Sequence, residues 1–373
     1  MSEPQVSIII PTLNEAENLP VLVPRIDQVL RGGGMKYEVI VVDDDSRDDT
    51  RAVCARLSEQ YPLALIVRQN IKDGLSGAVL QGMAAASGRT LVVMDADLQH
   101  PPEKIPELVD ALDAGADFAI GSRYVPGGST AQRWSPLRKV NSWAATFLAR
   151  PFAGRTHDPM SGFFALRRQT YLGATRLTPL GYKIALELMC KARVRDVREV
   201  PIHFGMRERG QSKLTLKQQF RYLEHLSRLY DFTFPRASPI VKFLIGTAAG
   251  WALAGFVYGL MLAPLGMVRA AIASYPIAVA VTALFHVRYV RTQREFLVTP
   301  HPWRDFWIIA LAEWVACAVV AAWWVRRALG PTPLEVLVLS FGAATIVRYM
   351  LRKEFLQDVR GLRRELRKDE LIA

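Results

Sequence analysis

Residues 37–59, Tyr-Glu-Val-Ile-Val-Val-Asp-Asp-Asp-Ser-Arg-Asp-Asp-Thr-Arg-Ala-Val-Cys-Ala-Arg-Leu-Ser-Glu, contain one complete strand, turn and helix pattern. The apolar run at 37–42 predicts a short buried strand, and residues 50–59 predict a helix. The pattern repeats on both sides of this stretch. Strands that alternate with helices predict an α/β domain with a mainly parallel, doubly wound (Rossmann-like) sheet. The further strands are expected at 6–11, 63–68 and 90–94, and the further helices at 15–30 and 76–86.

Polar side chains follow three of these strands at the point where each strand ends. In a doubly wound sheet, ligands bind beyond the carboxyl ends of the strands. We therefore expect a binding site at this edge of the sheet. The polar groups are Thr12, Asn14 and Glu15 after the first strand, Asp43, Asp44 and Asp45 after the second, and Asp95, Asp97 and Gln99 after the fourth.

The acid pair, Asp95 and Asp97, is the candidate metal site. In extended backbone, positions i and i+2 point the same way, so two carboxylates at this spacing can hold one hard cation. Gln99 is expected to assist them. Oxygen ligands favour Mg²⁺ or Mn²⁺ over zinc, and such a cation suits a diphosphate. Turn formation after a strand is the competing interpretation of the pair.

Two interpretations of the middle cluster remain open. Its acids can cap the helix that follows by accepting backbone N–H bonds, which we expect of Asp48 and Asp49. Asp43 and Asp44 lie at the strand end, where carboxylates can bind the base and ribose of a nucleotide. The glycine-rich G-x-G-x-x-G fingerprint of dinucleotide-binding proteins does not follow the first strand.

The charge balance of the chain restricts its partners. The 373 residues include 47 Lys and Arg against 35 Asp and Glu, and the pI is near 9.8. A basic chain favours nucleic acid, anionic lipid or phosphorylated substrates. Here the basic residues gather at the borders of apolar stretches and in one loop, without an aromatic-studded stripe, which argues against nucleic acid.

The composition changes near Pro235, after which four long apolar stretches follow. Each is near the roughly 20 residues that a helix needs to cross hydrocarbon, so we expect four membrane spans. A soluble protein with four such core helices would have too little polar surface to cover them. The predicted spans are Ile240–Leu262, Val268–Val287, Phe306–Val325 and Pro333–Met350.

The distribution of basic residues predicts the orientation in the membrane. The first residues lack the basic region and long apolar region of a signal peptide, so the N-terminal part is expected in the cytoplasm. Basic residues between the second and third spans and in the tail fit the same side, whereas Arg269, Arg326 and Arg327 oppose it. The expected domains are 1–235 (cytoplasmic), 236–351 (membrane) and 352–373 (a basic cytoplasmic tail).

Small and charged residues inside the spans suggest how the helices pack. Gly246 and Gly250, like Gly255 and Gly259, have a four-residue spacing that allows close helix contact, within one chain or in a homo-oligomer. Glu313 lies inside the third span, where an ionised group usually faces a partner or a polar cavity. We favour a structural partner over a transport role.

Two amphipathic stretches lie between the α/β pattern and the spans, at about 137–150 and 214–232. In the first, Trp143 lies on the apolar face with Arg138, Lys139 and Arg150 nearby, a pattern that favours a helix in the bilayer interface. The second is open between the same role and packing on the sheet.

Several ordered motifs in residues 5–235 resemble the inverting family 2 glycosyltransferases of the GT-A fold, and in particular the dolichol-phosphate mannose synthase group. The C-terminal spans are similar to the small membrane domain fused to some members. The motifs are VSIIIPTLNE (6–15), VVDDDS (41–46), DAD (95–97), GSRYVPGG (121–128), DPMSGF (158–163), GYK (181–183) and RERGQSKL (207–214).

The resemblance implies transfer of a sugar from a nucleotide to a polyprenyl phosphate. GDP-mannose is the preferred donor, UDP-glucose or another UDP-sugar is the alternative, and a sugar-lipid carrier or flippase is a remote one. The implied donor-binding residues are Pro11, Thr12, Glu15, Asp43, Asp44, Asp95, Arg207 and Lys213, the last two in a loop with Ser212 that closes over the diphosphate.

The acceptor supplies its own nucleophile. A phosphate monoester has a second pKa of about 6 and is mostly dianionic near neutrality, so no catalytic histidine is expected. It needs cations instead, because arginine offers a fixed fork for phosphate oxygens. We expect Arg123 and Arg138 in this role, with Ser142 adding a hydrogen bond, and Arg123, Arg138 and Asp97 as the catalytic residues.

Overall fold

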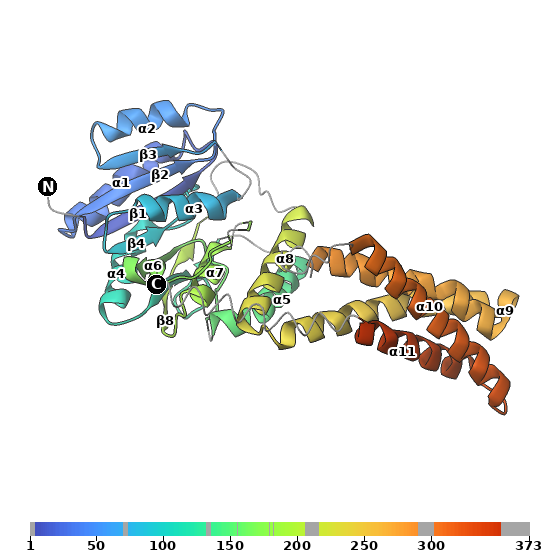
Figure 1. Ribbon diagram of the computed structural model, residues 1–373. Helices are drawn as coiled ribbons and strands as arrows, with labels where there is room; N and C mark the ends of the chain where they lie inside the picture. Colours follow the sequence, from blue (N-terminus) through green and yellow to red (C-terminus); the bar gives the residue numbers. More distant parts are fainter. Residues whose placement is uncertain are drawn as a thin grey trace, which may run out of the picture. The chain divides into compact units, whose positions relative to one another are not determined.

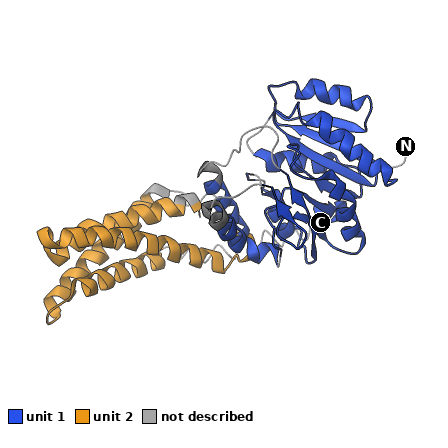
Figure 2. Ribbon diagram, turned by 180° about the vertical axis from the view of Figure 1, so that it is seen from behind, with its two compact units in different colours: residues 1–229 blue, residues 230–373 orange. Residues whose placement is uncertain are grey.

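The computed structural model describes residues 4–69, 74–131, 136–154, 156–178, 180–181, 183–205, 216–289 and 302–351. The chain forms two compact units, coloured separately in Figure 2. Unit 1 is Met1–Leu229 and unit 2 is Tyr230–Ala373. The division falls shortly before Pro235, where the composition changes. The tail expected at 352–373 lies outside the described residues.

Unit 1 is built on a seven-stranded sheet with the order β3-β2-β1-β4-β7-β5-β8 (Figure 1). All neighbouring strands are parallel except β7, which is antiparallel to both β4 and β5. Two short strands, β6 (Ser129–Thr130) and β9 (His203–Phe204), form a second, parallel pair. The strands of the large sheet are β1 (Val6–Thr12), β2 (Tyr37–Asp43), β3 (Leu63–Val67), β4 (Thr90–Val93), β5 (Phe118–Ser122), β7 (Phe164–Arg167) and β8 (Val197–Pro201).

Helices connect and cover these strands, as the β-α alternation predicts. Helix α3 packs against β1 and β2, and α4 packs against β5 and β7. The described helices of unit 1 are α1 (Leu19–Gly32), α2 (Thr50–Ser58), α3 (Gly74–Ala85), α4 (Ile105–Asp113), α5 (Pro136–Ala153), α6 (Arg168–Leu172) and α7 (Ile184–Lys191), with a 3-10 turn, η1, at Pro102–Lys104. Helix α8 (Leu216–Thr233) begins in unit 1 and ends in unit 2.

The core of unit 1 lies around its central strands. Every residue of β1 is buried, which is expected of a strand covered on both faces. Apolar residues of α1, including Leu22 and Ile26, complete this core. The prediction of a mainly parallel α/β sheet is therefore confirmed.

Helix α1 begins later than the sequence predicts, at Leu19 instead of Glu15. Asn14 has a left-handed backbone (φ 58°), which turns the chain directly after β1. The backbone N–H groups of Asn18 and Leu19 then donate to the Glu15 carbonyl, so a turn precedes the helix. This leaves Asn14 and Glu15 in a loop at the end of the sheet.

The described part of unit 2 contains three helices that are long and apolar enough to cross a membrane, at Ala237–His286, Phe306–Arg327 and Pro333–Leu351. They belong to α9 (Ala237–Tyr289), α10 (Pro302–Arg327) and α11 (Pro333–Leu351). The expectation of four separate helices is thus corrected, since the first two predicted spans lie in the single element α9.

Helix α9 is not straight. Gly266 has non-helical dihedrals (φ 73°, ψ 166°) that interrupt its 53 residues. A Cβ added at Gly246 would lie 3.0 Å from the Phe285 ring, and one at Gly250 would lie 3.0 Å from the Ala278 carbonyl oxygen. Residues on either side of Gly266 therefore pack against each other in antiparallel fashion. The first glycine pair accordingly serves contact within one chain.

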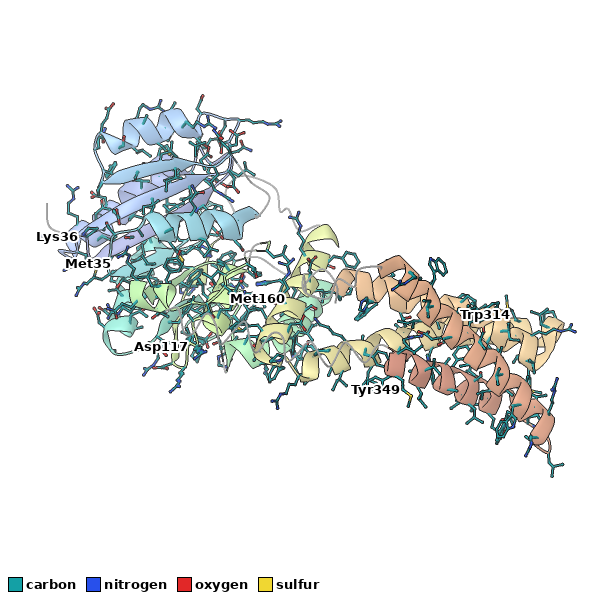
Figure 3. The ribbon with its side chains drawn as sticks, in the orientation of Figure 1. Met35, Lys36, Asp117, Met160, Trp314 and Tyr349 are labelled. Carbon is teal, nitrogen blue, oxygen red and sulfur yellow. The ribbon has the colours of Figure 1, made fainter. Side chains whose placement is uncertain are left out.

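A buried polar cluster joins the three helices of unit 2. The Arg348 guanidinium lies 2.8 Å from the Glu313 carboxylate, and both side chains are almost fully buried. Tyr275 Oη donates to Glu313 at 3.1 Å and accepts from Arg348 at 3.1 Å. Glu313 thus has the structural partner that the sequence analysis favours. Nearby, the indole of Trp314 donates to the Ile272 carbonyl and ties α10 to α9 (Figure 3).

Candidate active site

Three polar loops meet the carboxyl ends of β1, β2 and β4, and each contains a non-glycine residue in the left-handed region. These residues are Asn14 (φ 58°), Asp45 (φ 58°) and Leu98 (φ 61°). A left-handed backbone is uncommon outside glycine and clusters at functional sites. Leu98 separates Asp97 from Gln99, so the turn at the predicted metal site departs from extended geometry directly after the acid pair.

The acid pair lies just beyond β4. The Asp95 side chain is about a third exposed, whereas Asp97 is buried. The Gln99 backbone N–H donates to Asp97 Oδ1 at 3.2 Å, and the Gln99 side-chain amide donates to the Gly205 carbonyl at 3.0 Å. The bond to Asp97 is the turn chemistry that competes with the metal interpretation.

His100 contacts the turn that carries Asp95 and Asp97. Its Nδ1 accepts the Asp95 backbone N–H at 3.1 Å, and its ring stacks on Phe163. Burial lowers the pKa of this histidine, although the charges of Asp95 and Asp97 oppose the shift. A neutral imidazole that accepts a backbone bond is a structural element, as the sequence analysis expects.

Gly162 allows the loop before β7 to approach Asp95 closely. A Cβ at this position would lie 3.1 Å from Asp95 Oδ2 and 3.4 Å from the His100 ring. Because β7 is antiparallel to both neighbours, the residues that precede it meet the ends of β4 and β5 at once. The same loop therefore borders the acid pair and the groups that follow β5.

The acidic residues at 43–49, after β2, bond both to their neighbours in the chain and to the loop after β1. Asp43 is fully buried and accepts hydrogen bonds from the backbone N–H and hydroxyl of Ser46. Asp48 accepts from the backbone N–H of Thr50 at 3.1 Å and of Ala16 at 3.0 Å. Asp48 thus caps as expected, whereas Asp49, the N-cap residue of α2, makes no side-chain cap bond and that expectation is wrong.

Asp44 pairs with Arg68, a residue that the sequence analysis missed. Arg68 Nη1 lies 2.6 Å from Asp44 Oδ1 and 3.0 Å from the Gly74 carbonyl oxygen, and Arg68 is buried. Burial raises the pKa of Asp44 even though Arg68 lowers it. The sequence offered one signal for this pair, an arginine directly after β3. The carboxyl ends of parallel strands lie at the same edge of a sheet, so such a residue can reach the acids that follow β2.

The remaining predicted donor residues lie at the end of β1. Pro11 and Thr12 are the last two residues of β1 and are buried, and the Thr12 hydroxyl donates to the Val42 carbonyl at 3.2 Å. Glu15 accepts from the Asn18 side-chain amide at 2.6 Å. The structure thus gathers Pro11, Thr12, Glu15 and Asp44 at one end of the sheet.

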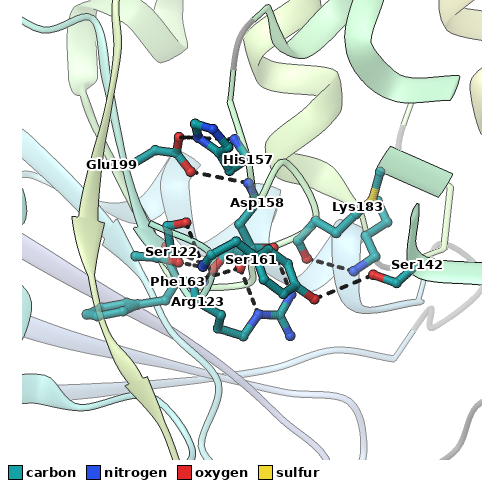
Figure 4. Close-up of polar contacts among 12 residues, drawn as sticks. Ser122, Arg123, Ser142, His157, Asp158, Ser161, Phe163, Lys183 and Glu199 are labelled. Atoms are coloured by element: carbon teal, nitrogen blue, oxygen red, sulfur yellow. Dashed lines mark hydrogen bonds and ion pairs between the residues drawn. The ribbon is translucent and has the colours of Figure 1, made fainter. Parts of the chain in front are cut away.

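Arg123 directly follows β5 and is held by Asp158 (Figure 4). Its Nε and Nη2 each donate to the Asp158 carboxylate at 2.7 Å, a bidentate pair. Burial would lower the pKa of this guanidinium, but the bonds to Asp158 outweigh burial and raise it. Glu199 on β8 accepts the backbone N–H groups of His157 and Asp158, which orients the loop that carries Asp158.

Aromatic rings and a hydroxyl border Arg123. Its guanidinium carbon lies 5.2 Å from the Tyr124 ring centroid and 5.1 Å from that of Phe204. Tyr124 Oη lies 3.5 Å from Ser142 Oγ on α5, so the predicted Ser142 is brought to the same region (Figure 4). Asp158 was also missed as a positioning group, although its motif was recognised.

Other predicted site residues lie beyond what the structure describes. Arg138 belongs to α5, but only its backbone is described. Arg207, Ser212 and Lys213 lie in the segment 206–215, outside the described residues.

The donor groups at the acid pair fit a hard divalent cation. Among the described residues, no group of three or more His, Cys, Asp and Glu side chains is arranged to hold a metal. Magnesium-type sites often use only one or two carboxylates together with water and substrate phosphates. A partly exposed Asp95 beside a buried Asp97 satisfies that requirement.

The amphipathic helix α5 exposes large apolar side chains. Trp143 is 67% and Phe147 is 54% exposed, and their rings stack on each other. On α8, Phe220 and Leu223 are also exposed, and Tyr222 donates to the Ala145 carbonyl of α5 at 2.8 Å. The two helices therefore pack together and leave apolar rings uncovered by the described residues of unit 1.

The chain is similar to several known proteins. The model of the family described as glycosyl transferase family 2 matches residues 7–174. A dolichol-phosphate mannosyltransferase of Pyrococcus furiosus is 47% identical over 249 residues, which are 66% of this chain and 69% of that protein. A dolichol-phosphate mannosyltransferase of Mycosarcoma maydis is 40% identical over 272 residues, which are 71% and 90% of the two chains. A solved glucosyl-3-phosphoglycerate synthase of Mycobacterium tuberculosis is 22% identical, with a TM-score of 0.48 over 61% of this chain and 78% of that chain.

The α/β domain with its mostly parallel sheet is GT-A-like, and the relatives define the class as a glycosyltransferase. The chain belongs to glycosyl transferase family 2, in which it is similar to the dolichol-phosphate mannosyltransferases.

Proposed function

We propose that this protein transfers mannose from GDP-mannose to a polyprenyl phosphate at the membrane. The observation that carries the proposal is the 40–47% identity to dolichol-phosphate mannosyltransferases over 249 to 272 residues. The groups that this reaction needs lie at the strand ends, with acids at β4 and a held arginine at β5. The products are a polyprenyl-phosphate sugar and a nucleoside diphosphate.

The donor side of the reaction must accommodate negative charge on the leaving diphosphate. Stabilising developing charge is usually the largest catalytic contribution. Asp95, Asp97 and Gln99 would hold Mg²⁺ or Mn²⁺, which supplies Lewis-acid stabilisation of that diphosphate. Pro11, Thr12, Glu15, Asp43 and Asp44 are proposed to bind the nucleotide. Both oxygens of Asp43 already accept hydrogen bonds from Ser46, and one oxygen of Asp44 lies 2.6 Å from Arg68.

The acceptor side needs cations but no general base. An oxygen of the phosphate dianion attacks the anomeric carbon, and the bond from that carbon to the diphosphate breaks on the opposite face, so the configuration inverts. Arg123 is proposed to bind the acceptor phosphate with Ser142. Arg138 and the loop residues Arg207 and Lys213 are proposed, from the resemblance alone, to bind the acceptor and the donor diphosphate respectively.

Asp158 supports this role for Arg123. A buried guanidinium with a bidentate carboxylate keeps one orientation, because planar fork-to-fork bonds restrict both partners. The two bonds to Asp158 offset the burial of Arg123.

The membrane part is proposed to cross the bilayer four times, with α9 crossing twice. A straight helix of 53 residues would extend about 80 Å, far beyond the roughly 30 Å of hydrocarbon. Gly266 and the antiparallel packing of Gly246 and Gly250 instead support a hairpin. Even numbers of crossings would keep unit 1 and the C-terminal tail on the cytoplasmic side, as the basic residues predict.

A labelled-donor assay on the purified, full-length protein tests the proposal. Label should pass from GDP-mannose to a polyprenyl phosphate in the presence of Mg²⁺ or Mn²⁺ and not in the presence of a chelator. Asp97→Asn should abolish transfer, whereas Asp110→Asn on α4 should not. Parallel assays with UDP-glucose decide the donor. Binding of donor without any sugar-lipid product would contradict an enzymatic role and favour a carrier.

A further inference from the structure

Lys183 occupies a position that local helix chemistry does not favour. It is the N-cap residue of α7, with φ −113° and ψ 50°, and makes no side-chain cap bond. N-cap positions prefer Ser, Thr, Asp or Asn, and the helix dipole disfavours a cation there. A residue that does not stabilise the start of its own helix suggests a role outside that helix.

The side chain of Lys183 reaches the loop that positions Arg123. Its Nζ donates to the Met160 carbonyl at 2.7 Å (Figure 4). Met160 lies between Asp158, which holds Arg123, and Gly162, which approaches Asp95. The ammonium group therefore lies where the loop borders both the acid pair and the arginine.

The electrostatic surroundings of Lys183 agree with this placement. Burial and, to a smaller extent, the positive charge of Arg123 lower its pKa to about 8, while Asp158 and Asp95 oppose the shift. The charges of Arg123 and of the predicted metal ligand Asp95 thus both affect Lys183. Below about pH 8 it adds a second positive charge beside Arg123.

The backbone next to Lys183 is anchored on the nucleotide side. The Gly181 carbonyl accepts the Ser76 backbone N–H at 3.1 Å, near the start of α3. Gly74, which begins α3, has a left-handed backbone (φ 60°), and its carbonyl accepts from Arg68. The segment that carries Lys183 is therefore fixed at one end to the elements around Asp44.

We infer that Lys183 binds the phosphate of the lipid acceptor together with Arg123, an inference that rests on the proposed function. The described structure supports it, because the ammonium donates to the loop that carries Asp158, the carboxylate that holds Arg123. The chemistry recognised is that of a phosphate monoester dianion, which two cations bind better than one. Lys183 neither gives nor takes a proton in the transfer.

Three variants of the full-length protein separate charge from structure. Lys183→Met removes the charge and the hydrogen bond, Lys183→Gln keeps a donor without charge, and Lys183→Arg keeps the charge. Lys104→Met is the matched control, because Lys104 pairs with Glu107 at the surface, in η1. Initial rates are measured against polyprenyl phosphate and, separately, against the sugar nucleotide at saturating Mg²⁺. Thermal unfolding is recorded for each variant.

Lys183→Met and Lys183→Gln are expected to raise the acceptor KM by about tenfold or more, as loss of a hydrogen bond to a charged group does. The donor KM should change less than about twofold, the span of an ordinary surface substitution. Lys183→Arg should restore the acceptor KM. Lys104→Met should match the wild type in both constants.

Other outcomes overturn the inference. If Lys183→Gln matches the wild type, the hydrogen bond to Met160 suffices and Lys183 is structural. If the donor KM rises while the acceptor KM is unchanged, the residue belongs to the donor site. If all variants share a lowered unfolding temperature with both constants altered, the role is structural. A wild-type protein that makes no sugar-lipid contradicts the proposed function itself, independently of the variants.

Discussion

At the scale of single residues, the buried pair of Arg123 and Asp158 links stability to function. Both side chains are largely shielded from water, so each depends on the other to offset the loss of hydration. A phosphate-binding arginine must keep its charge while buried, and the carboxylate of Asp158 makes this feasible. The same pair would otherwise add little to stability, because desolvation opposes the attraction between the charges.

Asp158→Asn should therefore lower the free energy of unfolding by about 3 kcal/mol, because it leaves a buried arginine without a charged partner. The acceptor KM should also rise, since Arg123 is no longer held in place. Chemical denaturation in detergent and initial-rate kinetics measure the two effects. The control is Asp113→Asn, which removes the exposed pair with Arg167 and should cost less than about 1 kcal/mol. Equal losses in the two variants would contradict the role given to Asp158.

The charge of Lys183 should make the kcat/KM for the acceptor depend on pH. The groups that face it are Asp95 after β4, Arg123 after β5 and Asp158 before β7, and burial with Arg123 lowers the pKa of Lys183 to about 8. The ammonium is charged below this pKa and neutral above it, so acceptor kcat/KM should fall as the pH rises through about 8. The acceptor is already a dianion there, because its second pKa is about 6.

Lys183→Arg provides the control for this pH effect. Arginine stays protonated far above pH 9, so the alkaline fall in acceptor kcat/KM should disappear in this variant. Rates are measured at several pH values with donor saturating. A fall of the same size in both proteins would assign it to another group and remove Lys183 as its cause.

At the scale of elements, α5 is proposed to connect the acceptor site with the membrane. It carries Ser142, which faces Tyr124, one residue before the exposed Trp143. The stacked rings of Trp143 and Phe147 suit the bilayer interface, where aromatic side chains are enriched. An acceptor phosphate attached to a membrane-embedded chain would then enter at the depth of the lipid headgroups.

The double variant Trp143→Ser, Phe147→Ser should raise the acceptor KM by about tenfold, because about 2 kcal/mol or less of apolar contact with lipid is lost. The donor KM and the unfolding temperature should stay near their wild-type values, since both rings are exposed in unit 1. Leu172→Ser, at an equally exposed site on α6, is the control. Unchanged acceptor kinetics in the double variant would place α5 away from the lipid.

At the scale of the whole molecule, the number of membrane crossings decides where the ends of the chain lie. Three helices are long and apolar enough to span, and one of them turns at Gly266. A chain that crosses four times returns to its starting side, whereas one that crosses three times does not. The buried Glu313, Arg348 and Tyr275 join the helices and would be costly to expose to lipid.

Cysteine labelling tests the four crossings. In a background without Cys54, Cys190 and Cys317, Leu265→Cys and Leu329→Cys should react with a membrane-impermeant reagent from the same side. A cysteine at exposed Lys36 in unit 1 should react only from the opposite side. Labelling of Leu265→Cys and Lys36→Cys from one side would show that α9 does not cross twice.

The sequence alone predicted the regular elements of unit 1 and the polar residues at their ends. Buried strands at 6–11, 37–42 and 90–94 and their polar successors were predictable, because strand burial and turn chemistry depend on residues close together in the chain. The start of α1 was missed, since the turn at Asn14 depends on contacts with the loop after β2, where Ser46 Oγ accepts its N–H.

Only the tertiary structure decided which of these groups meet. The short strand β7 is antiparallel between β4 and β5, and no local pattern shows that this brings Gly162 to Asp95 and Asp158 to Arg123. The pairing of Asp44 with Arg68 and the reach of Lys183 to Met160 likewise join residues more than 20 positions apart. Such contacts depend on how whole surfaces pack and therefore cannot be read from the periodicity of one segment. For the same reason, the hairpin in α9 follows from close helix contact at Gly246 and Gly250 as much as from the apolar length of the chain.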